Sequence, residues 1–194
     1  MNNISERHPL EPFLPQNARV LMLGSFPPPQ AKWSMQFFYP NWINDMWRIY
    51  GIIFHNDKHF FEKEGKKEFC KDRIEKFCTE KGIALYDTAC EVIRLKENAS
   101  DKFLKIVTPT DIHSLLEQIP HCTAVVTTGE KATDVITTTY GCEKPTVGEK
   151  SKIITDGREL HFWRMPSSSR AYPLQLEKKA EFYRRMLINE GFSI

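Results

Sequence analysis

RVLMLGSFPPPQAKWSMQFFYPNWINDMWRIYG, residues 19–51, is the stretch around which the rest of the chain is organised. It opens with a continuous apolar run, residues 20–23, which indicates a buried strand that ends at Gly24 in a proline-rich loop. After this loop, Pro40 and Asn41 predict the start of a helix. The side chains expected on its buried face are Ile43, Met46, Trp47 and Tyr50. Because ligands of open α/β sheets bind beyond the carboxyl ends of the strands, this aromatic loop suits a planar ligand.

The remaining sequence predicts strands that alternate with helices. Strands are expected at residues 83–86, 123–128 and 159–165, with a small edge strand at 153–154, and helices at residues 62–81, 110–119, from 130 onward and 174–190. Residues 91–109 lack a clear period and predict a long loop with a helical turn around residues 102–106. The alternation predicts an α/β sandwich with a mainly parallel sheet. The strand ends expected to converge on one edge of that sheet are Gly24, Asp87, Gly129 and Pro166.

The composition is typical of one globular domain that covers residues 1–194, with residues 1–18 as a polar, proline-rich arm. The 27 basic and 25 acidic residues give a net charge of +2, which excludes a strongly cationic protein that coats nucleic acid. The sequence shows neither a start of secretory type nor an apolar run of about 18 residues. We therefore expect a cytoplasmic protein without a membrane span, and a monomer.

The five cysteines are odd in number, and none has a second cysteine or a histidine at the spacing of a zinc site. This pattern argues against a bound metal or an iron–sulfur cluster. We expect reduced, buried thiols instead.

Several short motifs of this chain occur together in one known family. They are GSFP at residues 24–27, QFFYPNWINDMW at 36–47, ALYDTA at 84–89, VVTTGEKA at 125–132 and MPSSSRAYP at 165–173. In order and spacing they resemble the uracil-DNA glycosylase superfamily, and most of all its deoxyinosine (hypoxanthine) DNA glycosylase branch, whose first motif has the form GSxPG…QYY…N-x-x-W. The resemblance covers nearly the whole chain. It implies a three-layer α/β/α fold with a central four-stranded, mainly parallel sheet, no cofactor, and hydrolysis of the N-glycosidic bond of a deaminated base, hypoxanthine or uracil, in DNA.

A glycosylase must extrude its target base into a pocket before it can cleave the bond. The resemblance implies that Phe37 or Phe38 stacks on the flipped base, with core packing as the alternative for one of the two rings. Gln36 and the backbone of residues 24–28 are candidates for the polar edge of the base. The full predicted pocket consists of Gly24, Ser25, Phe26, Pro27, Gln36, Phe37, Phe38, Asp87, Thr128 and Gly129. For Asp87 the alternative role is to cap the following turn.

Cleavage also needs a group that positions the attacking water. Asn44 matches the position of the family's Asn ahead of the Trp, and it is our candidate catalytic residue. Asp45 is a stronger base, but neighbours on a helix point about 100° apart, so only one of the two is expected to face the pocket. Asn41 is a further alternative, although an Asn after a Pro is first of all a helix cap.

DNA must be held at its backbone. The hydroxyls and backbone amides of Ser167, Ser168 and Ser169 suit phosphate oxygens, with a plain turn as the alternative. Arg170 is placed to contact phosphate or to wedge into the vacated stack, and Lys131 is expected to add to this DNA-binding set. The implied partner is DNA that contains a deaminated base.

Two departures from the family pattern keep other functions open. Pro28 stands where the family has its second Gly, which removes a backbone donor, and Thr128-Gly129 replaces the Asn-Gly of many relatives. They support an alternative, a non-catalytic or diverged member that binds damaged or single-stranded DNA without hydrolysis. A third hypothesis is a small-molecule α/β enzyme that binds a nucleotide; weak salt dependence of any DNA binding would favour it.

Overall fold

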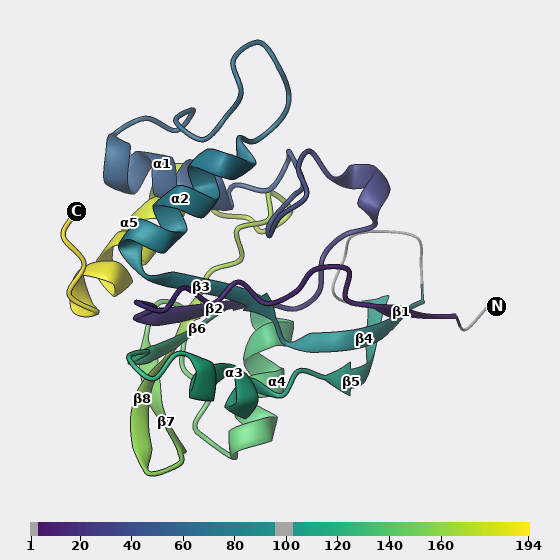
Figure 1. Cartoon of the computed structure of the whole chain (residues 1–194), viewed down its shortest axis with the longest axis vertical. Coiled ribbons are helices and arrows are strands. Elements are labelled where there is room, and N and C mark those ends of the chain that lie inside the picture. The colour runs from purple at the N-terminus through teal and green to yellow at the C-terminus, as the bar shows by residue number, and fades with distance from the viewer. Residues whose placement is uncertain (1–3, 96–102) are drawn as a thin grey trace.

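The computed structural model describes residues 4–95 and 103–194 and contains a central five-stranded sheet (Figure 1). The strands lie in the order β3 (Ile83–Asp87), β2 (Val20–Gly24), β6 (Ala124–Thr128), β8 (Arg158–Met165) and β7 (Lys150–Thr155). The first four are parallel to one another, and β7 runs antiparallel to β8 at the edge. The predicted mainly parallel sheet is therefore confirmed, with one strand more than the expected four.

Helices cover both faces of this sheet, which confirms the three-layer arrangement (Figure 1). One layer contains α1 (Met46–His55), α2 (Lys71–Lys81) and α5 (Leu176–Asn189), and the other contains α3 (Ile112–Gln118) and α4 (Glu130–Tyr140). A short 3-10 helix, η1 (Gln30–Lys32), lies in the loop after β2. In the two described ranges, no helix is both long enough and apolar enough to cross a membrane.

A second, antiparallel sheet stands beside the first, in the order β1 (Ser5–Arg7), β4 (Ala89–Arg94) and β5 (Leu104–Pro109). The prediction of a loop with a helical turn over residues 91–109 is therefore wrong for the part that the structure describes; Lys102 lies outside the described residues. Val92 and Leu104 are buried in these strands, while most other positions are half-buried or exposed. Apolar residues such as Ile93 and Val107 occupy half-buried or exposed positions of these strands, so the sequence shows no clear period of two.

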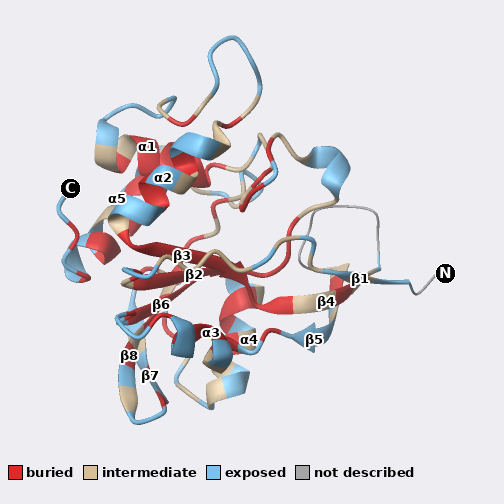
Figure 2. Ribbon diagram, viewed as in Figure 1, coloured by how far each residue is buried: buried red, intermediate tan, exposed pale blue. Residues whose placement is uncertain are grey.

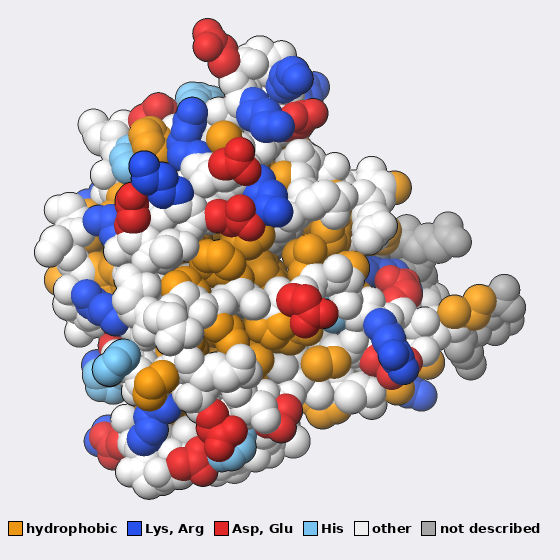
Figure 3. Space-filling view, in the orientation of Figure 1, with side chains coloured by type: hydrophobic (Ala, Val, Ile, Leu, Met, Phe, Trp, Pro, Cys, Tyr) orange, Lys and Arg blue, Asp and Glu red, His pale blue; other side chains and the backbone are white. Residues whose placement is uncertain are grey.

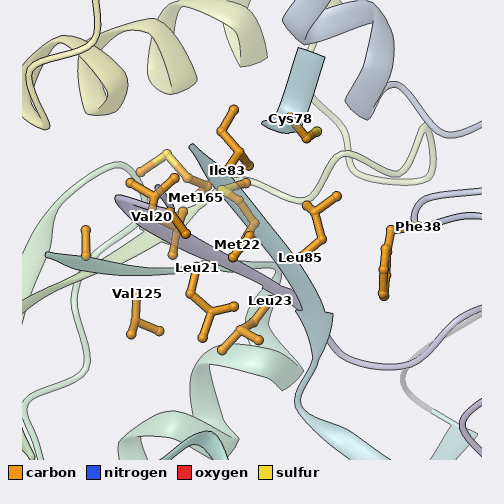
Figure 4. Packing of buried hydrophobic residues seen from close by; sticks show 14 of the residues in the cluster. Val20, Leu21, Met22, Leu23, Phe38, Cys78, Ile83, Leu85, Val125 and Met165 are labelled. Atoms are coloured by element: carbon orange, nitrogen blue, oxygen red, sulfur yellow. The ribbon is translucent and has the colours of Figure 1, made fainter. Parts of the chain in front are cut away.

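Strand β2 is buried along its whole length, because helices cover both of its faces (Figure 2). Val20 pairs with Ile83 and Met22 with Leu85, on the side of α5, and Leu21 pairs with Val125 on the side of α4 (Figure 4). Each such side chain contributes about 1.5–3 kcal/mol relative to an exposed position. This burial on two sides explains why the strand consists of an uninterrupted apolar run.

Helix α1 begins later than the sequence predicts. The side-chain oxygen of Asn41 accepts a hydrogen bond from the Ile43 backbone N–H (3.1 Å), and that of Asn44 accepts one from the Met46 N–H (2.9 Å). In a helix that began at Asn41, the N–H groups of Asp45 and Met46 would donate to backbone oxygens four residues earlier. Instead the Asp45 N–H donates to the Ser168 oxygen (2.9 Å) and the Met46 N–H to Asn44, so residues 41–45 are not helical. The predicted start at Pro40 and Asn41 is therefore wrong, as is the predicted burial of Ile43, a residue that is 57% exposed. Helix α2 likewise begins at Lys71 rather than at residue 62.

A glycine substitution tests the packing at the start of β2. Gly82 has φ +71°, and a Cβ there would lie 2.4 Å from the backbone oxygen of Asn17, whereas Gly65, at φ +68°, has no atom within 4 Å of such a Cβ. Gly65→Ala should cost about 1 kcal/mol of unfolding free energy, the strain of the left-handed backbone alone. Gly82→Ala should cost more than about 2 kcal/mol, because the backbone must also move. Chemical denaturation measures both, and equal losses would contradict the close approach at Gly82.

Candidate functional site

A cavity of ≈ 630 Å³ lies at the carboxyl edge of the central sheet, where the parallel strands end. The register pairs Gly24 with Asp87 and Thr128 with Met165, so the predicted strand ends lie side by side. The predicted site residues that line the cavity are Gly24, Ser25, Phe26, Pro27, Phe38, Asn41, Asn44, Asp87, Thr128, Ser167, Ser168 and Ser169. Lining residues outside the predicted set are Pro28, Tyr39, Pro40, Ile43, Ala171, Tyr172 and Pro173.

Other predicted site residues lie away from this lining as far as the chain is described. Gln36 is exposed on the surface, and Gly129 is the residue before α4, with Lys131 in the first turn of that helix. The ring of Phe37 is buried against Phe13, with 5.2 Å between the ring centroids.

Phe38 is the ring of the predicted pair that faces the cavity. The indole Nε1–H of Trp47 donates a hydrogen bond to the Phe38 backbone oxygen (3.0 Å), so a buried residue of α1 fixes this loop. The next residue, Tyr39, has φ 50°, a left-handed conformation that is uncommon outside glycine, and its hydroxyl lies 3.2 Å from the Thr128 hydroxyl. The loop thus presents an aromatic wall together with a polar contact to the end of β6.

Asp87 brings a carboxylate to the floor of the cavity, where its side chain is 10% exposed. It does not cap the following turn: its Oδ2 lies 2.9 Å from Nε2 of His8, in the N-terminal arm. Its Oδ1 lies against Gly24, where an added Cβ would be only 2.3 Å away. Glycine at the end of β2 is therefore what makes room for the carboxylate. His8 was missed in the sequence because nothing local links the arm to a residue 79 positions away.

Asn44 lines the cavity, but it is not on a helix. Its Oδ1 accepts the Met46 N–H, and its Nδ2 donates to no residue in the described parts of the chain. The residue also forms a bridge to Ser169, so it sits between the two loops that frame the cavity.

Asp45 points away from the cavity into a buried ionic cluster. Its Oδ1 accepts a hydrogen bond from Arg170 Nε (2.8 Å), and its carboxylate lies 3.7 Å from Arg48 and 3.6 Å from Lys179. Its backbone N–H donates to the Ser168 oxygen (2.9 Å). Asp45, the alternative candidate base, thus connects α1 and α5 with the loop of residues 166–171, called the serine loop below.

The cations of this cluster are unusual because two of them are buried. Burial lowers the pKa of Arg48 and of Lys179, while the neighbouring carboxylates oppose that shift. Glu62 pairs with Arg48 at 2.7 Å, and Lys179 Nζ donates to the Ser169 oxygen (2.8 Å). With Arg170, three cations face two carboxylates, which leaves one net positive charge behind the serine loop.

The serine loop is held by internal turns and by α5. Ser167 Oγ accepts the Ser169 N–H and Ser169 Oγ accepts the Ala171 N–H, both at 3.2 Å. The hydroxyl of Tyr183 donates to the Pro166 oxygen (2.9 Å). The loop is therefore a turn, as the alternative interpretation expected, and it also forms one wall of the cavity.

Charge is mixed on the face of the molecule seen in Figure 3, where Lys and Arg lie among Asp and Glu around a central group of hydrophobic side chains.

All five cysteines are free, and burial raises the pKa of the Cys122 thiol to about 11. Across residues 4–95 and 103–194, no three His, Cys, Asp or Glu side chains are grouped so that they could hold a metal ion.

No family model and no curated protein matches this chain by sequence. Among solved structures, the chain is similar to the solution NMR structure of "a putative Uracil DNA glycosylase from Methanosarcina acetivorans". The match has a TM-score of 0.63 at 19% sequence identity and covers 94% of this chain and 99% of that one. This likeness establishes the fold, which is the one implied by the motifs.

Removal of the Asp45 charge should destabilise the protein. Asp45→Asn leaves Lys179 and Arg48 buried with less compensation, and we expect a loss of about 3 kcal/mol in unfolding free energy. The matched control is Glu149→Gln, which removes the carboxylate of an exposed pair with Arg185 and should change stability far less. Denaturant titration measures both variants, and similar small losses would show that the Asp45 cluster is not a structural anchor.

Proposed function

We propose that this chain is a monofunctional DNA glycosylase that hydrolyses the N-glycosidic bond of a deaminated base, hypoxanthine or uracil, flipped out of DNA. The observation that carries the proposal is the convergence of the motif residues on one cavity at the carboxyl edge of the parallel sheet. Such an edge is where open α/β sheets bind ligands.

The cavity has the features that a flipped base requires. Phe38 gives a flat face for stacking, which contributes about 1–3 kcal/mol per base in single-strand binding sites. The polar side chains of Asp87 and Thr128, at the strand ends, can form hydrogen bonds with the polar edge of the base. A cavity of ≈ 630 Å³ is large enough for a purine or a pyrimidine with its sugar.

Asn44 is the proposed catalytic residue. It lines the cavity beside Ser169, where its amide can orient a water molecule toward the sugar as the base departs. Asp45 is less suited, because its carboxylate is occupied by three cations. Asn41 also lines the cavity and remains the alternative.

The serine loop is the proposed DNA contact. Ser167, Ser168 and Ser169 offer hydroxyls at the cavity wall, and the ionic cluster behind them adds a positive charge. Arg170 pairs with Asp45 but is 47% exposed at its side chain, so it can turn toward a phosphate. We propose that the protein acts as a cytoplasmic monomer on DNA, without a cofactor, and that Lys131 extends the contact.

The fold adds support, since the similar structure from Methanosarcina acetivorans carries the name "putative Uracil DNA glycosylase". A second candidate function is a non-catalytic member that binds damaged or single-stranded DNA. Two observations favour it: the Asn44 oxygen is already engaged by the Met46 N–H, and Pro28 in the cavity lining has no N–H to offer.

A cleavage assay distinguishes the two. The purified protein is incubated with labelled oligonucleotides that contain one uracil, hypoxanthine or xanthine, single-stranded and paired, and alkali then reveals abasic sites. Alkali-labile product on any of them supports the glycosylase and identifies its base. The absence of product beside tight, salt-sensitive binding would support the non-catalytic alternative.

Asn44→Ala should lower turnover by at least about 100-fold while DNA affinity is retained, because the lost group acts on the transition state. The matched variant is Asn44→Asp, which keeps an acceptor for the Met46 N–H and for water and should retain activity within about tenfold. Single-turnover kinetics and a binding titration measure the two effects. Unchanged turnover in Asn44→Ala would transfer the catalytic role to Asn41 or Asp45.

Arg170→Ala should weaken activity on duplex DNA more than on single strands, because only the duplex must be opened and held. If Arg170 contacts one phosphate, the slope of log affinity against log salt should also fall by about 1. The control is Lys76→Ala, an exposed charge on α2 away from the cavity lining. An equal loss on both substrates would argue against a role of Arg170 in opening the duplex.

A further inference from the structure

The N-terminal arm places a histidine against Asp87, behind the lining of the cavity. Strand β1 pairs with β4, and the His8 backbone N–H donates to the Cys90 oxygen (2.7 Å), which fixes the arm beside the end of β3. The His8 side chain is only 2% exposed. Its ring packs among Phe26, Phe38 and Tyr86, with centroid distances of 5.3, 6.2 and 4.6 Å.

Both ring nitrogens of His8 have partners, so its orientation is fixed. Nε2 lies 2.9 Å from Asp87 Oδ2, and Nδ1 lies 2.9 Å from the Leu10 oxygen and 3.2 Å from the Leu10 nitrogen. The neutral tautomer with a proton on Nε2 can accept from the Leu10 N–H, and the imidazolium can donate to the Leu10 oxygen. In either state His8 donates to Asp87.

This contact leaves one carboxylate oxygen of Asp87 for the cavity. Oδ1 accepts no hydrogen bond from any described residue, although the Asp87 side chain is nine-tenths buried. Among the described residues that line the cavity, Asp87 is also the one charged side chain. Among the described residues, the buried side-chain oxygens without a hydrogen-bond partner belong to Glu62 and Thr88, so Oδ1 of Asp87 is open to the cavity and is an acceptor that a bound ligand can reach.

We propose that His8 is a positioning residue that holds Asp87 so that Oδ1 accepts a hydrogen bond from a ring N–H of the bound base. This role of His8 rests on the proposed function, and the feature of the base that the site selects is a ring N–H. Deamination converts a ring nitrogen from an acceptor into an N–H donor, in hypoxanthine relative to adenine and in uracil relative to cytosine. A fixed carboxylate attracts that N–H and repels the lone pair of the unmodified base.

Enzyme kinetics test the role of His8. His8→Leu should reduce the single-turnover rate on the preferred oligonucleotide by about 10- to 100-fold with little change in the KM for DNA, since phosphate contacts dominate affinity. His8→Gln, which can still donate to Asp87, should recover activity to within about fivefold of the wild type. Ser5→Ala is the matched control. Ser5 lies in the same arm as His8, donates a hydrogen bond to Glu91 of β4 and lies outside the cavity lining, so this variant should behave as the wild type. Full activity in His8→Leu, or equal losses in the Leu and Gln variants, would overturn the proposal.

Binding of free bases by the wild-type protein tests the preference for a ring N–H. This test requires neither catalytic turnover nor a substituted protein that must fold. In calorimetric titrations, hypoxanthine or uracil should bind at least about tenfold more tightly than 1-methylhypoxanthine or 3-methyluracil, in which the ring N–H is replaced. Equal binding of the methylated bases, or no binding of either free base, would overturn the proposal. If no oligonucleotide is cleaved while the free bases keep this preference, the proposed function fails and the role of Asp87 stands.

Discussion

The carboxylate of Asp45 is the constraint on which the arrangement of the site depends. It lies buried at the start of α1 and faces Arg48 of the same helix, Lys179 of α5 and Arg170 of the serine loop. A buried charge must be paired, so these three elements cannot shift independently of one another. The Asp45 N–H adds a backbone bond to Ser168. Because Asn44 precedes Asp45 and Ser168 lies in the cavity wall, the ionic cluster fixes two walls of the cavity from behind.

The central sheet could be predicted from the sequence because its parallel strands are buried on both faces. Residues 20–23 form an uninterrupted apolar run for that reason, and the polar or glycine residues at the strand ends marked the edge of the sheet. The second sheet could not be predicted, because most positions of β4 are half-buried, most positions of β5 are exposed, and neither sequence shows a clear period of two. Helix α1 starts later than predicted because the Asp45 N–H donates to the distant Ser168 oxygen and the Met46 N–H to the Asn44 side chain, a competition that an apolar pattern does not reveal.

The candidate site was predictable where it coincides with strand ends and with the motifs, and not where it depends on contacts between distant segments. Adjacent aromatic residues such as Phe37 and Phe38 look alike in sequence; in the structure Phe37 packs against Phe13 and Trp47, and Phe38 lines the cavity. His8 lies in residues 1–18, whose sequence indicates only a polar, proline-rich arm. Its place follows from the pairing of β1 with β4, a strand that was itself missed.

The proposed chemistry sets two demands on the cavity that oppose each other. A carboxylate beside the base favours a ring N–H, but it also opposes the negative charge that develops on the base as the glycosidic bond breaks. The hydrogen bond from His8 draws negative charge toward Oδ2 of Asp87, the oxygen that faces away from the base. The net positive charge behind the serine loop stabilises the negative charge on the departing base. On the proposed function, discrimination between modified and normal bases therefore has a cost in leaving-group stabilisation. His8 reduces that cost, because it is buried against Asp87, the one charged side chain among the described residues of the cavity lining.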